Sequence, residues 1–246
     1  MDFIRFMGGV IIKKVIYIYY ILSFLLFLGF VILIVNAYSN VSQAVSTSVN
    51  NKTPIIVIDA GHGGEDGGAT ANNIIEKDIN LSIAKKLEMI FTSNGYEVIM
   101  TRTDDNSIGV KDTTIREQKV SDMKKRLEIY NSNKENIVIS IHQNKFQQEK
   151  YNGTQIFYST NNEKSSILAE NIKTSVVNLL QPNNTRECKK ATKEIYLLYN
   201  SKAPSVIVEC GFISNKNEAE KLKTDSYQKQ LAFTIYLGVS NYINQI

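Results

Sequence analysis

Cysteine is scarce in this chain, with only Cys188 and Cys210 among its 246 residues. Two thiols exclude a disulfide framework and allow at most one bridge, and their spacing matches no zinc-binding motif. Cys210 follows a strand-like apolar run and could equally be a small buried hydrophobe, whereas Cys188 lies in a polar stretch. The sequence alone leaves open whether the two residues pair.

A strong excess of charge and a phosphate-binding motif are also lacking. The net charge is +4 at pH 7, a balance that does not indicate nucleic acid as a partner. A glycine-rich cluster occupies residues 59–68, but it has neither the G-x-x-x-x-G-K-[ST] pattern nor the G-x-G-x-x-G spacing of phosphate-cradling loops. No internal repeat and no second globular domain are evident.

Charged residues are absent from the 21-residue run Val15–Val35. An α-helix of about 20 apolar residues spans a bilayer, and signal-peptide apolar regions are usually shorter, about 7 to 15 residues. We therefore expect residues 1–36 to hold a short cytoplasmic stub and a retained transmembrane anchor. The stretch Ser42–Ala44 resembles a cleavage site, so removal of the segment as a signal, with secretion of the remainder, stays an alternative.

The charges around this run predict its orientation. Arg5, Lys13 and Lys14 precede it, and no charge follows until Lys52, so the positive-inside bias keeps the amino terminus in the cytoplasm. Residues 37–53 are rich in Ser, Asn and Thr, which is typical of a flexible linker. The remaining residues, 54–246, are expected to form one globular domain on the outer side of the membrane.

Strand-like and helix-like apolar patterns alternate along this domain. Strands are expected at 55–58, 96–101, 137–141, 154–158, 195–198 and 205–210, and helices at 77–94, from Ser121 onward, and at 164–180, 216–222 and 227–242. Such an alternation predicts an α/β fold, a single domain in which helices flank a mainly parallel six-stranded sheet.

The only two histidines each follow a run of Ile and Val. His62 lies just after the first predicted strand, within the glycine cluster, and His142 ends the run Ile137–Ile141. Strand ends of an open α/β sheet present side chains to ligands, so two imidazoles placed in this way are expected to converge on a metal ion. The alternative is that both are ordinary structural histidines.

A catalytic zinc site commonly adds one carboxylate to two histidines and keeps a position open for water. The candidate carboxylates are Glu65, Asp66, Glu76, Asp78 and Glu209. Glu76 stands at the start of a predicted helix, where it could be a ligand or could simply interact with the helix dipole. Glu209 ends an apolar strand, where burying a charge is costly unless it has a partner or a function.

Four blocks of the sequence together resemble one enzyme family. They are VIDAGHGGEDGGA (57–69), EKDINLSIAKKLEMIFTSNGYEVIMTRTDD (76–105), ISIHQN (139–144) and PSVIVECGFISNKNEAEKL (204–222). In this order they resemble the zinc-dependent N-acetylmuramoyl-L-alanine amidases of the type-3 amidase family. The resemblance covers essentially all of residues 54–246, and it implies that this region is a zinc amidase catalytic domain.

The resemblance also implies roles for particular residues. His62, Glu76 and His142 match the zinc ligands of the family, and Glu209 matches its catalytic glutamate. Gly67 and Gln143 depart from the commonest pattern, at positions where a proline and a small residue are frequent. Asp59 could orient a ligand or could simply fix the turn.

The implied reaction is hydrolysis of the amide bond between N-acetylmuramic acid and the L-alanine of the stem peptide in peptidoglycan. Zinc would activate water and polarise the carbonyl group, and Glu209 would move the proton from water to the leaving nitrogen. A zinc carboxypeptidase acting within the stem peptide and an inactive wall-binding scaffold are the alternatives.

The long segment 106–120, the segment 153–159 and the single anchor make the chain look most like the sporulation-specific amidases. Those enzymes prepare spore-cortex peptidoglycan for muramic δ-lactam formation. An exported amidase of this kind could also need an activating protein partner, which the sequence does not identify.

Overall fold

The computed structural model describes residues 19–36, 54–111 and 113–245. Residues Pro54–Ile246 make up one compact unit. In the other unit, Tyr19–Asn36 is a helix long and apolar enough to cross a membrane, and its side chains are exposed in the structure. The predicted linker over 37–53 and the basic residues before the apolar run lie outside the described residues.

The compact unit is a mixed α/β domain, as predicted. Its six-stranded sheet has the order β4-β1-β5-β8-β6-β7. The strands are β1 (Ile56–Ala60), β4 (Val98–Met100), β5 (Ile137–Asn144), β6 (Gln155–Tyr158), β7 (Lys189–Lys190) and β8 (Ser205–Phe212). All neighbours pair in parallel except β6 and β8, which are antiparallel. A small hairpin of β2 (Thr70–Ala71) and β3 (Ile74–Ile75) stands apart from this sheet.

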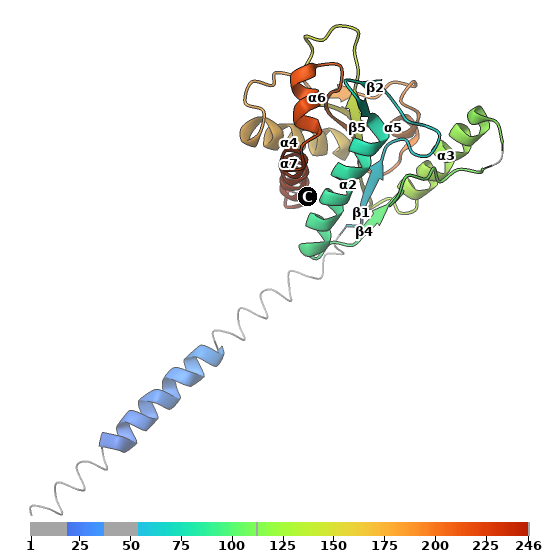
Figure 1. The fold of residues 1–246 in the computed structure, drawn as a ribbon. Coiled ribbons are helices and arrows are strands. Elements are labelled where there is room, and N and C mark those ends of the chain that lie inside the picture. Colours follow the sequence, from blue (N-terminus) through green and yellow to red (C-terminus); the bar gives the residue numbers. More distant parts are fainter. Residues whose placement is uncertain (1–18, 37–53, 112, 246) are drawn as a thin grey trace, which may run out of the picture. The chain divides into compact units, whose positions relative to one another are not determined.

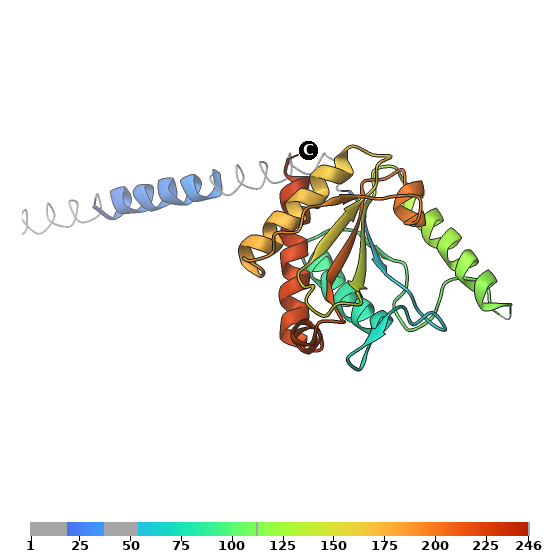
Figure 2. The ribbon, with the colours of Figure 1, turned by 90° about the horizontal axis from the view of Figure 1, so that it is seen from above.

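Helices cover both faces of the sheet. They are α2 (Glu76–Ser93), α3 (Ile115–Tyr130), α4 (Lys164–Leu179), α5 (Tyr196–Asn200), α6 (Lys216–Leu222) and α7 (Asp225–Ile243). Helices α2, α4 and α7 pack together, with the larger core cluster between them and the sheet. Helices α3 and α5 lie on the other face, over a smaller cluster (Figures 1 and 2).

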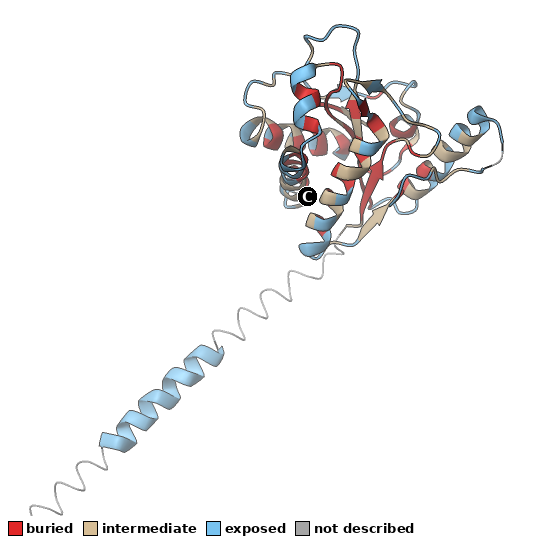
Figure 3. Ribbon diagram, viewed as in Figure 1, coloured by how far each residue is buried: buried red, intermediate tan, exposed pale blue. Residues whose placement is uncertain are grey.

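The period of two along the central strands explains the two cores. On β5, Ile137, Ile139 and Ile141 enter the larger cluster, whereas Val138 faces the smaller one. Successive side chains of a strand point to opposite faces, so His142 lies on the same face as Val138. Burial is concentrated in the central strands and the helix faces against them (Figure 3).

Two local expectations were wrong, and one strand of the six-stranded sheet was missed. The run Ile195–Leu198 was expected to be a strand, but Tyr196–Asn200 is the helix α5, and Leu197 and Leu198 are buried. A short apolar run has the same composition in either element, so its periodicity does not decide between them. The sixth strand is instead the exposed pair Lys189–Lys190.

The second wrong expectation concerns the start of α3, which was expected near Ser121. The helix begins at Ile115 instead, because Thr114 and Glu117 form a capping box. In this box the Thr114 side chain accepts from the Glu117 amide, and Glu117 accepts from the Thr114 amide. The two cysteines, whose pairing was open, are both free.

Candidate metal centre

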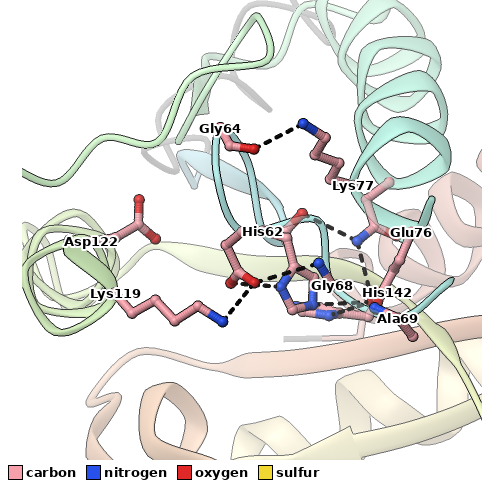
Figure 4. A network of polar contacts seen from close by, with 12 residues as sticks. His62, Gly64, Gly68, Ala69, Glu76, Lys77, Lys119, Asp122 and His142 are labelled. Carbon is pink, nitrogen blue, oxygen red and sulfur yellow. Dashed lines mark hydrogen bonds and ion pairs between the residues drawn. The ribbon is translucent and has the colours of Figure 1, made fainter. Parts of the chain in front are cut away.

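The two histidines lie together at the carboxyl ends of β1 and β5, and Glu76, which the residues alone left undecided, lies with them (Figure 4). Glu76 Oε1 lies 3.0 Å from Nδ1 of His142 and 3.3 Å from Nε2 of His62. The two imidazole rings meet edge to face, with centroids 5.0 Å apart. One atom from each of the three residues lies within 4.8 Å of the other two, a spacing that suits ligands of one metal ion.

Local backbone structure brings these side chains together. His142 is on β5, His62 is two residues beyond the end of β1, and Glu76 is the first residue of α2. Between His62 and Glu76 the chain turns sharply at Gly68, whose φ is +69°. A Cβ at this position would lie 2.6 Å from Oε2 of Glu76, so only glycine lets the loop pass so close to the carboxylate.

Glu76 is almost fully buried, with 4 % of its surface exposed. Burial alone would raise the pKa of Glu76, but hydrogen bonds from His142 and His62 hold it well below its usual range. Backbone amides of Ala69 and Gln143 also donate to its two oxygens, at 2.8 and 3.0 Å. The carboxylate is therefore held ionised and oriented, as a metal ligand must be.

His62 has carboxylates on both sides of its ring. Its Nδ1 lies 2.9 Å from Oδ2 of Asp66, while Nε2 faces Glu76. Burial favours the neutral ring, but the hydrogen bonds to Asp66 and Glu76 outweigh it and raise the pKa of His62 to about 9. Such a surplus of negative charge suits a bound cation as well as a proton.

Glu209 is on β8, in register with His142 of the neighbouring strand β5. Paired residues of adjacent parallel strands point to the same face, so its carboxylate lies on the face of the histidines. Burial raises the pKa of Glu209 to about 7. Among the described residues its buried Oε2 has no hydrogen-bond partner, which is unusual for a buried carboxylate outside a functional site.

The other candidate carboxylates differ in their exposure and in their contacts with the histidines. Asp66 contacts His62, whereas Glu65 and Asp78 have exposed side chains and lie outside the cluster of possible ligands. Beside the cluster is a cavity of about 160 Å³ between the His62 loop and α3. His62 and His142 border it on one side, and apolar side chains of Met123 and Leu197 contribute to the rest.

Sequence reasoning missed the polar network beneath this site. Asp59 is fully buried and forms an ion pair with Arg126, whose side chain is 2 % exposed. Hydroxyl groups of Tyr130 and Ser140 also donate to Asp59, at 2.6 and 2.5 Å. Burial would raise the pKa of Asp59, but the Arg126 charge and these hydrogen bonds hold it well below its usual range.

The arginines of this region also fix the chain around His62. Arg126 donates to the carbonyl oxygen of His62 at 2.7 Å, and Arg102 donates to those of Ala60 and Gly61 at 2.9 and 3.1 Å. A carboxylate inside the apolar strand β1 signals that a buried partner exists. No local pattern identifies Arg126, 67 residues away, as that partner.

Comparisons with known proteins support the resemblance seen in the sequence. Residues 56–241 match the family described as N-acetylmuramoyl-L-alanine amidase. The germination-specific N-acetylmuramoyl-L-alanine amidase of Bacillus subtilis (strain 168) is 34 % identical over 228 residues, covering 91 % of this chain and 94 % of that protein.

Solved structures agree in fold. The CwlD amidase from Clostridioides difficile, in complex with the GerS lipoprotein, has a TM-score of 0.75 and 38 % identity, covering 78 % of this chain and all of that one. An N-acetylmuramoyl-L-alanine amidase from Clostridium difficile 630 has a TM-score of 0.67 and 29 % identity, covering 79 % and 98 %.

Proposed function

This chain belongs to the N-acetylmuramoyl-L-alanine amidase family and is an amidase, and we propose that it uses zinc to release stem peptides from peptidoglycan. The bond cleaved would be the amide between N-acetylmuramic acid and L-alanine. The observation that carries the zinc assignment is the convergence of two imidazoles and one carboxylate on a space of 4.8 Å. This donor set is common in catalytic zinc sites.

The residues present fit such an ion. His62, Glu76 and His142 would hold it, and together they supply two neutral nitrogen ligands and one anionic oxygen. Bound zinc would lower the pKa of a water molecule to about 7 and polarise the substrate carbonyl. The buried position of Glu76 and its hydrogen bonds from Ala69 and Gln143 keep the ligand set preorganised.

Glu209 would move the proton. Its carboxylate is on the face of the histidines, and within the described part of the chain its Oε2 has no hydrogen-bond partner. Its pKa of about 7 is close to neutral pH. A group with such a pKa can accept a proton from the attacking water and return it to the leaving nitrogen of alanine. Amide hydrolysis needs both steps, because an unprotonated amine anion is a poor leaving group.

The site of action would be outside the cytoplasmic membrane. The apolar helix Tyr19–Asn36 supports a membrane anchor, and basic residues occur only on its amino-terminal side until Lys52. The positive-inside bias would then place residues 54–246 on the outer side, where peptidoglycan lies. Cleavage of the segment would instead release the enzyme.

We also propose a role in spore-cortex maturation that leads to muramic δ-lactam. The germination-specific amidase of Bacillus subtilis, similar over nearly its whole length, supports this assignment. The Clostridioides difficile CwlD amidase was solved with a lipoprotein, GerS. That complex supports a protein partner for this chain as well, and we propose that such a partner would activate the enzyme.

Two measurements test the proposal. Metal analysis of the purified protein should find one zinc ion, which is lost in His62→Ala, Glu76→Ala and His142→Ala. Mass spectrometry of digested peptidoglycan should then find whole stem peptides with L-alanine amino termini. Shortened peptides still attached to glycan would indicate a carboxypeptidase instead, and zinc retained by Glu76→Ala would require another carboxylate, with Glu65 the next candidate.

A glutamate variant separates catalysis from wall binding. Glu209→Gln should keep zinc and lose peptide release by several orders of magnitude. Equal activity of the variant and the wild type would remove Glu209 as the proton carrier. Inactivity of the wild type would call for the assay to be repeated with extracts from sporulating cells, which contain candidate partners.

A further inference from the structure

His62 has a backbone conformation that non-glycine residues rarely adopt. Its φ is +62°, in the left-handed region, which costs a side-chain-bearing residue about 1 to 2 kcal/mol. Such a conformation persists only when the surroundings hold it, and it occurs often at functional sites. The contacts that hold His62 therefore bear on the metal centre.

The side chain of His62 is held by Asp66. Nδ1 of the ring lies 2.9 Å from Oδ2 of Asp66, while Nε2 points to the opposite side, toward Glu76. A carboxylate on one ring nitrogen keeps the proton there and directs the lone pair of the other nitrogen outward. Asp66 would thus present Nε2 of His62 to the ion.

Asp66 is itself fixed by two elements. Within the loop, its backbone exchanges hydrogen bonds with Gly63, at 2.9 and 3.2 Å. From outside the loop, Nζ of Lys119 lies 2.9 Å from Oδ1, the oxygen that does not face His62. Figure 4 shows Lys119 reaching from α3 toward the carboxylate beside His62.

Helix α3 therefore holds His62 in two ways. Lys119 acts through Asp66 on the imidazole, and Arg126, about two turns later on the same helix, donates to the His62 carbonyl oxygen at 2.7 Å. His142 differs: within the part of the chain that the structure describes, its side chain has a polar contact with Glu76, and its ring packs on Gly61 and against the ring of His62. The hydrogen bonds and ion pair described from α3 therefore lead to His62.

We propose that Asp66 and Lys119 are positioning residues, which transmit the placement of α3 to the metal-binding nitrogen of His62. The proposal deepens the proposed function, since it assumes that an ion binds between His62, Glu76 and His142. It assigns no contact with substrate to either residue. Lys119 contributes by orienting Asp66, and Asp66 by orienting the ring.

Zinc affinity of the full-length protein in detergent tests the proposal, measured by competition with a chromophoric chelator. Asp66→Asn should weaken zinc binding about 10- to 100-fold, the usual loss when a partner of a ligating histidine is removed. Asp78→Asn is the matched control, because it removes the same charge from an exposed position nearby. An affinity equal to that control would overturn the role of Asp66.

Lys119 is tested in the same assay. Both side chains of its pair are partly in water, so Lys119→Met should weaken zinc about two- to fivefold, and Lys119→Arg should restore the affinity. Removing a nearby positive charge would by itself strengthen cation binding, and Lys124→Met, at an exposed position of α3, measures that effect. If the zinc affinity of Lys119→Met is no lower than that of Lys124→Met, Lys119 is not a positioning residue.

A spectroscopic readout distinguishes positioning from general damage. With ¹⁵N-labelled histidine, the zinc-loaded protein has only two imidazoles, and His62 should show a slowly exchanging proton on Nδ1. Asp66→Asn should move this signal and speed its exchange with water, while the His142 signal stays in place. A wild type that binds zinc in this way but releases no stem peptide, even with extracts from sporulating cells, would refute the proposed reaction and leave this inference standing. Unchanged His62 signals in Asp66→Asn would refute this inference and leave the proposed reaction standing.

Discussion

Gly61 lies directly against the imidazole of His142. A Cβ at position 61 would be 2.3 Å from both Cε1 and Nε2 of that ring, closer than any real side chain approaches. The φ of Gly61 is not in the left-handed region, so space rather than backbone freedom requires glycine here. The ring can keep its place beside Glu76 only while position 61 has no side chain.

We therefore expect Gly61→Ala to displace His142 and lower zinc affinity at least tenfold, because one ligand would leave its position. Chelator competition measures the affinity, and circular dichroism reports whether the fold is kept. Gly67→Ala is the matched control in the same loop, where a Cβ would meet only the Ile75 side chain, at 3.3 Å. Equal zinc affinity in both variants would show that the ring adjusts without cost.

The buried pair of Asp59 and Arg126 should dominate the stability of this end of the sheet. Arg126→Met should lower the free energy of unfolding of residues 54–246 by about 3 to 5 kcal/mol, because it leaves the buried charge of Asp59 uncompensated. Asp59→Asn should cost less, because Arg126 keeps its ion pair with Asp122. The double variant should lose much less than the sum. Urea titrations give the coupling energy, with Arg116→Met on the exposed part of α3 as control; additive losses would contradict the pairing.

Glu209 should make stability depend on pH in the metal-free protein. Its pKa rises from 4.5 to about 7 on folding, so the folded state binds the proton more tightly. The associated stability is present below pH 4.5 and is lost as the pH rises through about 7. The Glu209→Gln variant should not lose stability in this way, because glutamine does not titrate.

The stability of Glu209→Gln relative to wild type should therefore be about 3 kcal/mol higher at pH 8 than at pH 4. Unfolding free energies at the two pH values check this, and Glu128→Gln, at an exposed position, corrects for removal of one charge. A relative stability that does not change with pH would mean that Glu209 is solvated in the folded protein.

Residues 1–36 should account for membrane attachment. The full-length chain should sediment with membranes and resist extraction by high salt, because an apolar helix of this length is held by the hydrocarbon core. A chain that begins at residue 54 should be soluble. If expression of the full-length chain gives a soluble product with a shortened amino terminus, the segment is a cleaved signal.

Much of the fold could be predicted from local patterns. The helix expected at 216–222 matches α6, and the run that leads to His142 is the buried strand β5. The capping box of Thr114 and Glu117 is also visible in the sequence, and it predicts the observed start of α3 at Ile115. The strand Lys189–Lys190 has no such signal, because an exposed edge strand has no apolar face.

The candidate site was likewise only partly predictable from the sequence. Strand ends predicted the placement of His62 and His142, and Glu209 stood out as a charge inside an apolar run. Glu76 could not be separated from an ordinary helix-start acid by local chemistry, and the resemblance to the amidase family was needed to choose it. Asp66 was one of several acids in a glycine-rich loop, and only its distance to His62 distinguishes it from Glu65.

The sequence by itself determined which chemical groups this protein has and on which elements they stand, because strand and helix periodicity are local properties of the chain. It also determined that no other imidazole could take the place of either one, since there are only two histidines. Tertiary structure alone decided that Glu76 contacts both rings, that Arg126 meets Asp59 and that Lys119 reaches Asp66. Those contacts join residues far apart in the chain, and their distances depend on how α2 and α3 pack against the sheet.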